Sequence, residues 1–270
     1  MTIPTIRTFA ALGAALVLSA CSMEKNAVQE ITAPVSGGLV RFFNFGYGAP
    51  TVNFYANDAK VTAITSATGN ESTSGVAYGG VGNAGNYSAL PPGSYTFAGK
   101  ITATTDKDLA ISSIAGTLVE GNRYSVFQSG AYNTTAKSVD GFIVEDDVPG
   151  AFDWTKAYVR FVNASDNSNP MTLNATNTVS GEIIPVGTAI TYKSAGSFVA
   201  VAPGTYNIAG TCGATCNSTG SGNNTITVSR TALSMTAGRV YTITLRGDVK
   251  LNPLTTTLAN RLLFDFTANR

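Results

Sequence analysis

The sequence contains no histidine and few charged residues, and both absences narrow the functions open to it. Without histidine, the chain cannot build a Ser-His-Asp or Cys-His catalytic arrangement, a histidine-ligated zinc site or a histidine pH switch. Charged residues make up 12% of the chain, against about a quarter in typical proteins, and the net charge is +1. No stretch concentrates lysine and arginine, so a nucleic-acid footprint and a polybasic membrane patch are not expected.

The mature part of the sequence also lacks a sustained helical stripe of apolar residues. Apolar residues nevertheless make up 44% of the chain, so a packed core is expected and wholesale disorder is not. Threonine, serine, asparagine and glycine replace the missing charges, and this mixture suits short strands joined by polar turns. A length of 270 residues corresponds to one or two domains.

The first twenty residues have the order of a secretory signal peptide. Arg7 precedes the apolar run Phe9–Leu18, which small residues follow. That run is about ten residues long, whereas a bilayer-spanning helix needs roughly 20. Leu18-Ser19-Ala20-Cys21 resembles the bacterial lipobox, which implies cleavage before Cys21 and attachment of fatty acyl chains such as palmitate to that cysteine. An ordinary signal peptide with a chance cysteine is the alternative.

The residues after Cys21 predict where the protein resides. Ser22 stands where aspartate would resemble an inner-membrane retention signal, so the resemblance favours the outer membrane, on its periplasmic or its surface face. Residues 21–37 lack periodicity and end in a Pro/Ser/Gly turn, as a flexible tether does. The membrane, reached through the lipid anchor, is therefore one expected partner.

Three blocks of the first half recur in the same order in the second half. They are Leu39–Asn44 with Tyr158–Asn163, Leu90–Phe97 with Val201–Ile208, and Leu118–Val126 with Met235–Ile243. Near-constant spacing indicates a tandem duplication. We expect a signal peptide at 1–20, a tether at 21–37, repeat 1 at 38–149 and repeat 2 at 150–270, with the boundary in the polar turn Asp146–Gly150.

The blocks have the pattern of β-strands. Val40 and Phe42 fall on one face of a strand, while Tyr241, Ile243 and Leu245 alternate with threonines. Pro92-Gly93 and Pro203-Gly204 suit type II turns, and Gly121 and Gly238 stand at the turn before the last strands. The sequence predicts an all-β fold: two tandem immunoglobulin-like antiparallel β-sandwich domains after an N-terminal signal peptide.

The same blocks resemble the bacterial family called domain of unknown function 4397. Val159–Ser165 matches its V-R-F-x-(N/H)-A-S start, Pro203–Tyr206 its P-G-x-Y turn, and Ala237–Thr242 its A-G-x-x-Y-T strand. The first repeat departs at Phe43–Gly46. The resemblance covers most of residues 38–250 and implies immunoglobulin-like sandwiches in envelope proteins, often in tandem. It implies no reaction.

Two further cysteines and several carboxylates are candidates for a disulfide, a metal site or a catalytic site. In an oxidising compartment Cys212 and Cys216 predict a structural disulfide that stiffens a hairpin tip. The carboxylates Asp106 and Asp108, and the group Glu145–Asp147 with Asp153, are typical of solvated loops. A calcium site at the hinge and a hydrolase with two carboxylates are the alternatives. We expect no catalytic residue, metal or cofactor.

The remaining motifs are best interpreted as structural features. Gly80–Gly85 fits G-x-G-x-x-G, but two following prolines prevent the helix that a dinucleotide site needs, so a surface loop is expected. Arg41 and Arg160 occupy equivalent strand positions and predict an ion pair or a solvated face, with arginines of a binding face as the alternative. Trp154 predicts a core residue or, alternatively, one that packs across the seam between the repeats.

Loops on rigid sandwiches often carry recognition residues, and three residues here are candidates: Tyr47, Tyr78 and Asn167. We therefore expect a non-catalytic, membrane-anchored envelope lipoprotein that binds an unknown envelope protein or polysaccharide or has a structural role, with no nucleic-acid partner. The alternatives are a glycan-binding or adhesion protein and an envelope hydrolase.

Overall fold

The computed structural model describes residues 36–63, 74–212, 226–251 and 256–269, all within one compact unit, Ser36–Arg270. The first half of this unit contains β1 (Gly38–Tyr47), β2 (Val52–Ala56), β3 (Ala59–Lys60), β4 (Gly80–Val81), the short 3-10 helix η1 (Gly82–Gly85), β5 (Ser88–Leu90), β6 (Gly93–Ile101), β7 (Ile114–Leu118), β8 (Arg123–Asn133) and β9 (Ser138–Glu145). The second half contains β10 (Ala157–Asn163), β11 (Met171–Asn177), β12 (Ile183–Ile190), β13 (Ser194–Ala195), β14 (Val199–Val201), β15 (Gly204–Cys212), β16 (Ile226–Met235), β17 (Val240–Arg246) and β18 (Leu263–Ala268).

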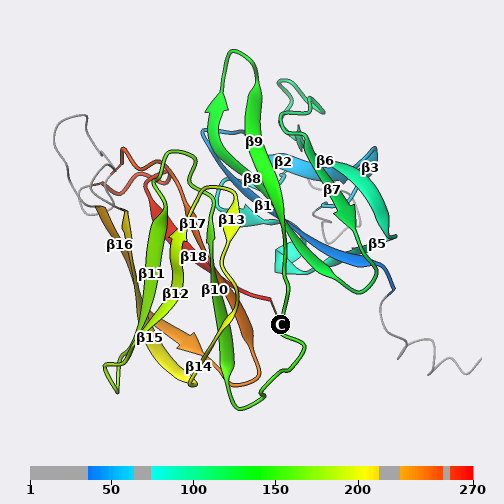
Figure 1. The fold of residues 1–270 in the computed structure, drawn as a ribbon. Coiled ribbons are helices and arrows are strands. Elements are labelled where there is room, and N and C mark those ends of the chain that lie inside the picture. The colour runs from blue at the N-terminus through cyan, green and yellow to red at the C-terminus, as the bar shows by residue number, and fades with distance from the viewer. Residues whose placement is uncertain (1–35, 64–73, 213–225, 252–255, 270) are drawn as a thin grey trace, which may run out of the picture. The chain divides into compact units, whose positions relative to one another are not determined.

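The strands form four sheets, two in each half, so the fold is all-β as the sequence predicts (Figure 1). In the first half the orders are β4-β1-β8-β9, with β5 also on β1, and β3-β2-β6-β7. In the second half they are β13-β10-β17-β18, with β14 also on β10, and β12-β11-β15-β16. Each half contains one parallel pair, β1 with β8 and β10 with β17, and the other pairs are antiparallel.

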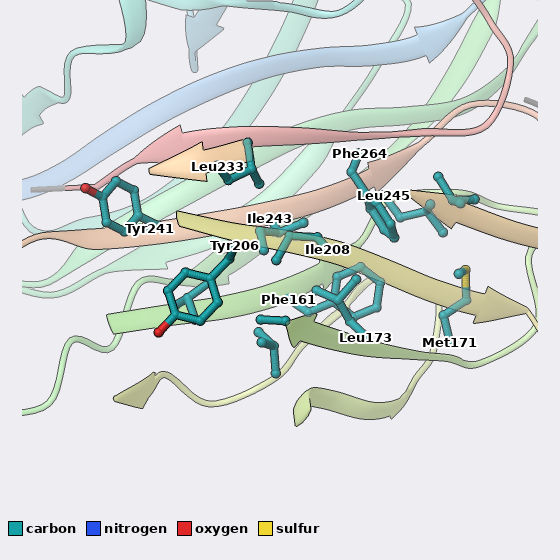
Figure 2. Packing of buried hydrophobic residues seen from close by; sticks show 14 of the residues in the cluster. Phe161, Met171, Leu173, Tyr206, Ile208, Leu233, Tyr241, Ile243, Leu245 and Phe264 are labelled. Carbon is teal, nitrogen blue, oxygen red and sulfur yellow. The ribbon is translucent and has the colours of Figure 1, made fainter. Parts of the chain in front are cut away.

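The two sheets of each half enclose a hydrophobic core, which makes each half a β-sandwich whose strand pairs are antiparallel apart from the one parallel pair. In the first half, Val40 and Phe42 of β1 pack with Phe54 of β2 and Phe97 of β6. The second core is the larger of the two; Figure 2 shows its members Phe161, Met171, Leu173, Tyr206, Ile208, Leu233, Tyr241, Ile243, Leu245 and Phe264. The alternation that predicts these inward faces is confirmed at β1 and β17.

Two tyrosines explain why the blocks of the first half recur in the second. The hydroxyl of Tyr95 donates to the carbonyl of Pro91 at 2.9 Å, and the hydroxyl of Tyr206 donates to that of Ala202 at 2.7 Å. Each bond runs back to the backbone four residues upstream, as in the tyrosine corner of immunoglobulin-like sandwiches. The P-G-x-Y pattern therefore marks a tyrosine corner, in which the tyrosine hydroxyl bonds to the backbone at the start of β6 and of β15.

A second pair of tyrosines closes the turn before β8 and before β17. The hydroxyl of Tyr124 accepts from the amide of Val119 at 3.1 Å, and that of Tyr241 accepts from the amide of Thr236 at 3.0 Å. Gly121 and Gly238 lie in these turns with φ of 78° and 74°, a region that favours glycine. The turns predicted at both glycines are confirmed.

The type II turn predicted at Pro203-Gly204 is wrong. Gly204 has no positive φ and is already the first residue of β15, while Gly93 opens β6 with φ of 147°. At both places the glycine is the first residue of a strand, and the tyrosine two residues later bonds back to the backbone. Gly80–Gly85 forms β4 and η1, and no α-helix follows it before β5, as the two prolines predict.

Candidate functional site

Strands β1 and β10 are buried on both faces. Arg41 is 1% exposed and Arg160 is 2% exposed, on the faces opposite Val40 and Val159. The same face of β1 carries Phe43 and Phe45, each 1% exposed. These faces meet in a junction between the sheets of β1 and β10, and a solvated face is the wrong interpretation for both arginines.

Four phenylalanines fill the centre of this junction. Phe127 of β8 stacks on Phe43 with ring centroids 4.6 Å apart and on Phe142 of β9 with centroids 5.0 Å apart. Phe45 lies 5.8 Å from Phe127 and 5.3 Å from Phe43. Val162 and Ala164, which follow Arg160 along the second half, belong to the same buried cluster. All four rings come from the sheet β4-β1-β8-β9, and the second half meets this aromatic face through Val162 and Ala164.

Asp146 lies at one side of the phenylalanine cluster, buried at 3% exposure. Its carboxylate pairs with the guanidinium of Arg160, and it accepts from the hydroxyl of Ser125 at 2.8 Å and from that of Tyr87 at 2.5 Å. Arg160 also donates to the carbonyl of Glu145 at 2.7 Å and to Thr242 at 3.2 Å. The solvated polar turn expected here is wrong at Asp146, because its carboxylate is the acceptor for a buried arginine.

Arg41 makes the corresponding contact from the first half. Its guanidinium donates to the carbonyl of Ala268 in β18 at 2.8 Å and to the hydroxyl of Tyr87 at 3.1 Å. It also stacks over the Tyr87 ring, 4.5 Å from the centroid. Burial raises the pKa of Tyr87 above its ordinary value, and the charge of Asp146 raises it further. The phenol is therefore held neutral as a donor to Asp146.

The three residues predicted for binding loops, Tyr47, Tyr78 and Asn167, lie at or near this junction. There they contact other residues of the chain. Tyr47 donates to Asp166 at 3.1 Å, across the two halves. Asn167 donates to Asp248 at 2.7 Å and accepts from the amide of Val249 at 3.0 Å.

Tyr78, the third predicted residue, is half-buried beside Arg246. Its ring centroid lies 4.7 Å from the guanidinium carbon of Arg246, which also lies over Phe45 at 5.4 Å and pairs with Asp265. Burial raises the pKa of Tyr78. The contacts of these three residues join the two halves or fix loops within one half. Tyr47, Tyr78 and Asn167 therefore have structural roles in the described part of the chain.

Tyr192 is a junction residue that the sequence did not single out. Its hydroxyl lies 3.0 Å from the hydroxyl of Ser129, and its ring meets Phe142 edge-on at 6.0 Å. Burial raises the pKa of Tyr192. The signals that could have revealed the junction were Phe43 and Phe45 on the same strand face as Arg41, because a solvated face rarely carries two phenylalanines.

Two of the hollows in the described part of the chain have similar volumes. One, of about 440 Å³, adjoins the junction and is lined by Glu145, Asp147, Pro149, Arg160, Ala195, Gly196, Ser197 and Phe198. The other, of about 460 Å³, lies in the first half between β2 and β4 and includes Asn53, Thr62, Val76 and Asn83 in its lining. The first hollow places two exposed carboxylates beside the buried Arg160.

The carboxylates that are candidates for hydrolysis or calcium binding have separate partners and do not act as one group. Asp106 pairs with Lys137 at 2.6 Å on the surface, and Asp153 accepts from the amide and hydroxyl of Thr155. Those hydrogen bonds lower the pKa of Asp153. Within the described ranges, no group of three or more acidic, cysteine or histidine residues is arranged to hold a metal ion. Asp146 is already bound by three donors.

Trp154 is not a core residue, so the core interpretation of it is wrong. Its side chain is 61% exposed. The indole meets Phe152 edge-on at 4.9 Å, and Phe152 in turn stacks on Tyr158 at 4.6 Å. The segment between β9 and β10 therefore presents its tryptophan outward.

Several expectations fall on residues outside the described ranges. These include the signal peptide at 1–20, the lipidated Cys21 and the tether; Cys216 and the side chain of Cys212 also lie outside them, and with them the disulfide. No helix in the described portion is both long and apolar enough to cross a membrane.

Comparisons with solved structures find distant likenesses only. A leucine-rich repeat protein from Bacteroides thetaiotaomicron is 14% identical over 84% of this chain, with a TM-score of 0.21, and this chain spans 27% of its length. Candidate cell adhesion proteins from Bacteroides eggerthii and Bacteroides ovatus are 9% and 10% identical over 87% and 88% of this chain and 96% and 97% of theirs, with TM-scores of 0.23 and 0.22. A comparison with curated proteins finds no significant match.

The sequence profile of the family described as "Domain of unknown function (DUF4397)" matches residues 38–176. The match covers the whole first sandwich and continues through β10 into β11, the strand that ends at Asn177. It ends earlier than the resemblance at 38–250 suggested. Because the match covers more than half of the sequence, the chain belongs to the DUF4397 family.

Proposed function

We propose that this protein is a lipid-anchored component of the bacterial cell envelope whose two β-sandwiches act together as one rigid, non-catalytic binding or structural module. The anchor part of the proposal comes from Leu18–Cys21 and the apolar run before it. Two or three acyl chains on Cys21 would give stable attachment, whereas a single chain holds only marginally. The outer membrane is the proposed location, because Ser22 follows the cysteine.

The observation that carries the rigid-module part is the buried junction. Four phenylalanines on one face of the β1 sheet form a buried cluster with Val162 and Ala164 of the second half, and Arg160 of β10 pairs with Asp146 at its side. Two domains joined by a polar, hydrated interface move relative to each other by default, whereas a buried apolar interface holds them. A module of this kind suits presentation of a binding surface at a fixed orientation.

The same junction favours a binding or structural role over hydrolysis. Hydrolysis by two carboxylates needs both acids beside one substrate bond, one able to give a proton and the other to act as base or nucleophile. Asp146 instead accepts from Arg160, Ser125 and Tyr87, and Asp106 is paired with Lys137. These contacts hold Asp146 and Asp106 in structural roles, so a hydrolase would have to use Glu145 and Asp147, the exposed carboxylates of the hollow beside Arg160.

The anchor is tested by replacing Cys21 with alanine and following the protein in membrane and soluble fractions of a bacterial host. Metabolic labelling with an alkyne analogue of palmitate reports the acyl chains directly. We expect the unmodified sequence to be labelled and membrane-bound, and C21A to lose both properties. N26A, in the predicted tether, is the matched control and should behave as the unmodified chain does. Equal labelling of C21A would refute the anchor.

A further inference from the structure

The single tryptophan of the chain is exposed on a corner that hydrogen bonds hold rigidly. The amide of Gly238 donates to the carbonyl of Lys156 at 2.8 Å, and the amide of Tyr158 donates to that of Arg239 at 2.9 Å. The amide of Asp153 donates to the hydroxyl of Tyr158 at 2.8 Å. We call residues 152–158 with 236–239 the Trp154 corner.

The indole itself is positioned by packing on one side. Phe152 meets it edge-on, and a β-carbon built at Gly238 would lie 3.3 Å from its Cε3 atom. Gly238 therefore lets the backbone pass close beside the ring. Phe152 and the Gly238 backbone thus contact the indole, and 61% of Trp154 remains exposed to solvent.

The first sandwich makes the same backbone hydrogen bonds at the corresponding turn. There the amide of Gly121 donates to the carbonyl of Gly37 at 3.0 Å, and the amide of Leu39 donates to that of Asn122 at 2.9 Å. A β-carbon built at Gly121 would meet no described atom within 4 Å. By the offset that relates Leu39 to Tyr158, the sequence position equivalent to Trp154 is Val35, so the tryptophan is specific to the second repeat.

The surroundings of Trp154 indicate which ligand it suits. Asp153, Thr155, Lys156 and Arg239 are all exposed around it, and their charges are mixed. A protein-binding hot spot would lie in a wider apolar patch, and a membrane-inserting one would avoid the carboxylate. One flat apolar ring with hydrogen-bonding neighbours instead matches the apolar face and the hydroxyl rim of a pyranose.

We propose that the Trp154 corner is a binding site for a neutral polysaccharide, with one sugar ring stacked on the indole. This inference rests on the proposed binding role and names its ligand class. The rigid corner keeps the conformational cost of binding low, because the ring is already held in place before the ligand arrives. Asp153, Thr155, Lys156 and Arg239 would exchange hydrogen bonds with the hydroxyls.

The test uses the fluorescence of Trp154, which is site-specific because the chain has one tryptophan. The full chain, purified from membranes in mild detergent, is titrated with soluble β-glucan, xylan and galactomannan. We expect at least one of them to shift the emission to shorter wavelength and to protect it from iodide quenching. In affinity electrophoresis through gels containing that polysaccharide, W154A should lose about tenfold in affinity, and W154F should lose less.

V119A is the matched control, because Val119 is 52% exposed in the turn of the first sandwich that corresponds to the corner. It should bind as the unmodified chain does, and melting curves of all variants should coincide. No shift with any of the three polysaccharides, equal retardation of W154A, or a shift with phosphatidylglycerol vesicles alone would overturn the inference. The labelling of Cys21 and the rigidity of the junction do not depend on Trp154, so they separate this failure from a failure of the proposed function.

Discussion

Replacing Asp146 with alanine would remove the acceptor of three buried donors at once. Arg160 would keep its charge at 2% exposure, with only the Glu145 carbonyl and the Thr242 hydroxyl left as acceptors. Removing one partner of a buried ion pair costs roughly 3–5 kcal/mol, because the other charge stays buried without compensation. At about 2–4 °C per kcal/mol for a chain of this size, the melting temperature should fall by roughly 6–20 °C.

The assay is urea and thermal unfolding followed by circular dichroism at pH 7, and the chain supplies its own control. Asp147 is the next residue and is exposed, so D147A should stay within about 0.5 kcal/mol of the unmodified chain. A double variant with leucine at position 146 and methionine at position 160 should recover most of the loss, because it removes both charges together. If D146A and D147A have the same unfolding midpoint, the Arg160–Asp146 pair does not hold the junction and the reasoning fails.

Three further outcomes follow from the same contacts. F127A empties the centre of a stack in which Phe127 is fully buried, and should cost about 3–5 kcal/mol in urea unfolding; a loss below about 1 kcal/mol would show that the junction is loosely packed. The pKa values of Tyr47, Tyr87 and Tyr192 are raised by burial, so unfolded tyrosines release protons first. The free energy of unfolding is therefore full below about pH 10 and should fall as the pH rises further, with a shallower slope in Y87F; equal slopes would remove Tyr87 from this account. Excess chelator should leave the melting temperature unchanged, because Asp146 is occupied by Arg160; a fall of several degrees would restore the calcium hypothesis.

The sandwiches could be predicted from the sequence because their determinants are local. Alternation at Val40 and Phe42 marks an inward face, and P-G-x-Y marks a corner where Tyr95 and Tyr206 bind backbone four residues back. The same locality misled the turn prediction at Gly204, because proline followed by glycine suits a type II turn equally well. The hydrogen bond from the Tyr206 hydroxyl to the Ala202 carbonyl cannot be predicted from Pro203 and Gly204 alone.

The junction could not be predicted in the same way, because its contacts join residues far apart in sequence. Arg41 meets Ala268, and Tyr47 meets Asp166, through pairings that no local pattern encodes. Asp146 lies in a segment rich in acid residues and proline, which is typical of a solvated linker. Its burial depends on Arg160 from the next strand and on Tyr87 from another loop.

Differential scanning calorimetry of the full chain tests most directly whether the two sandwiches form one body. The buried junction predicts a single transition whose calorimetric and van't Hoff enthalpies agree, since neither half can unfold without exposing the phenylalanine cluster. In F127A the transition should broaden or divide in two. Two independent transitions in the unmodified chain, unchanged in F127A and D146A, would contradict the account.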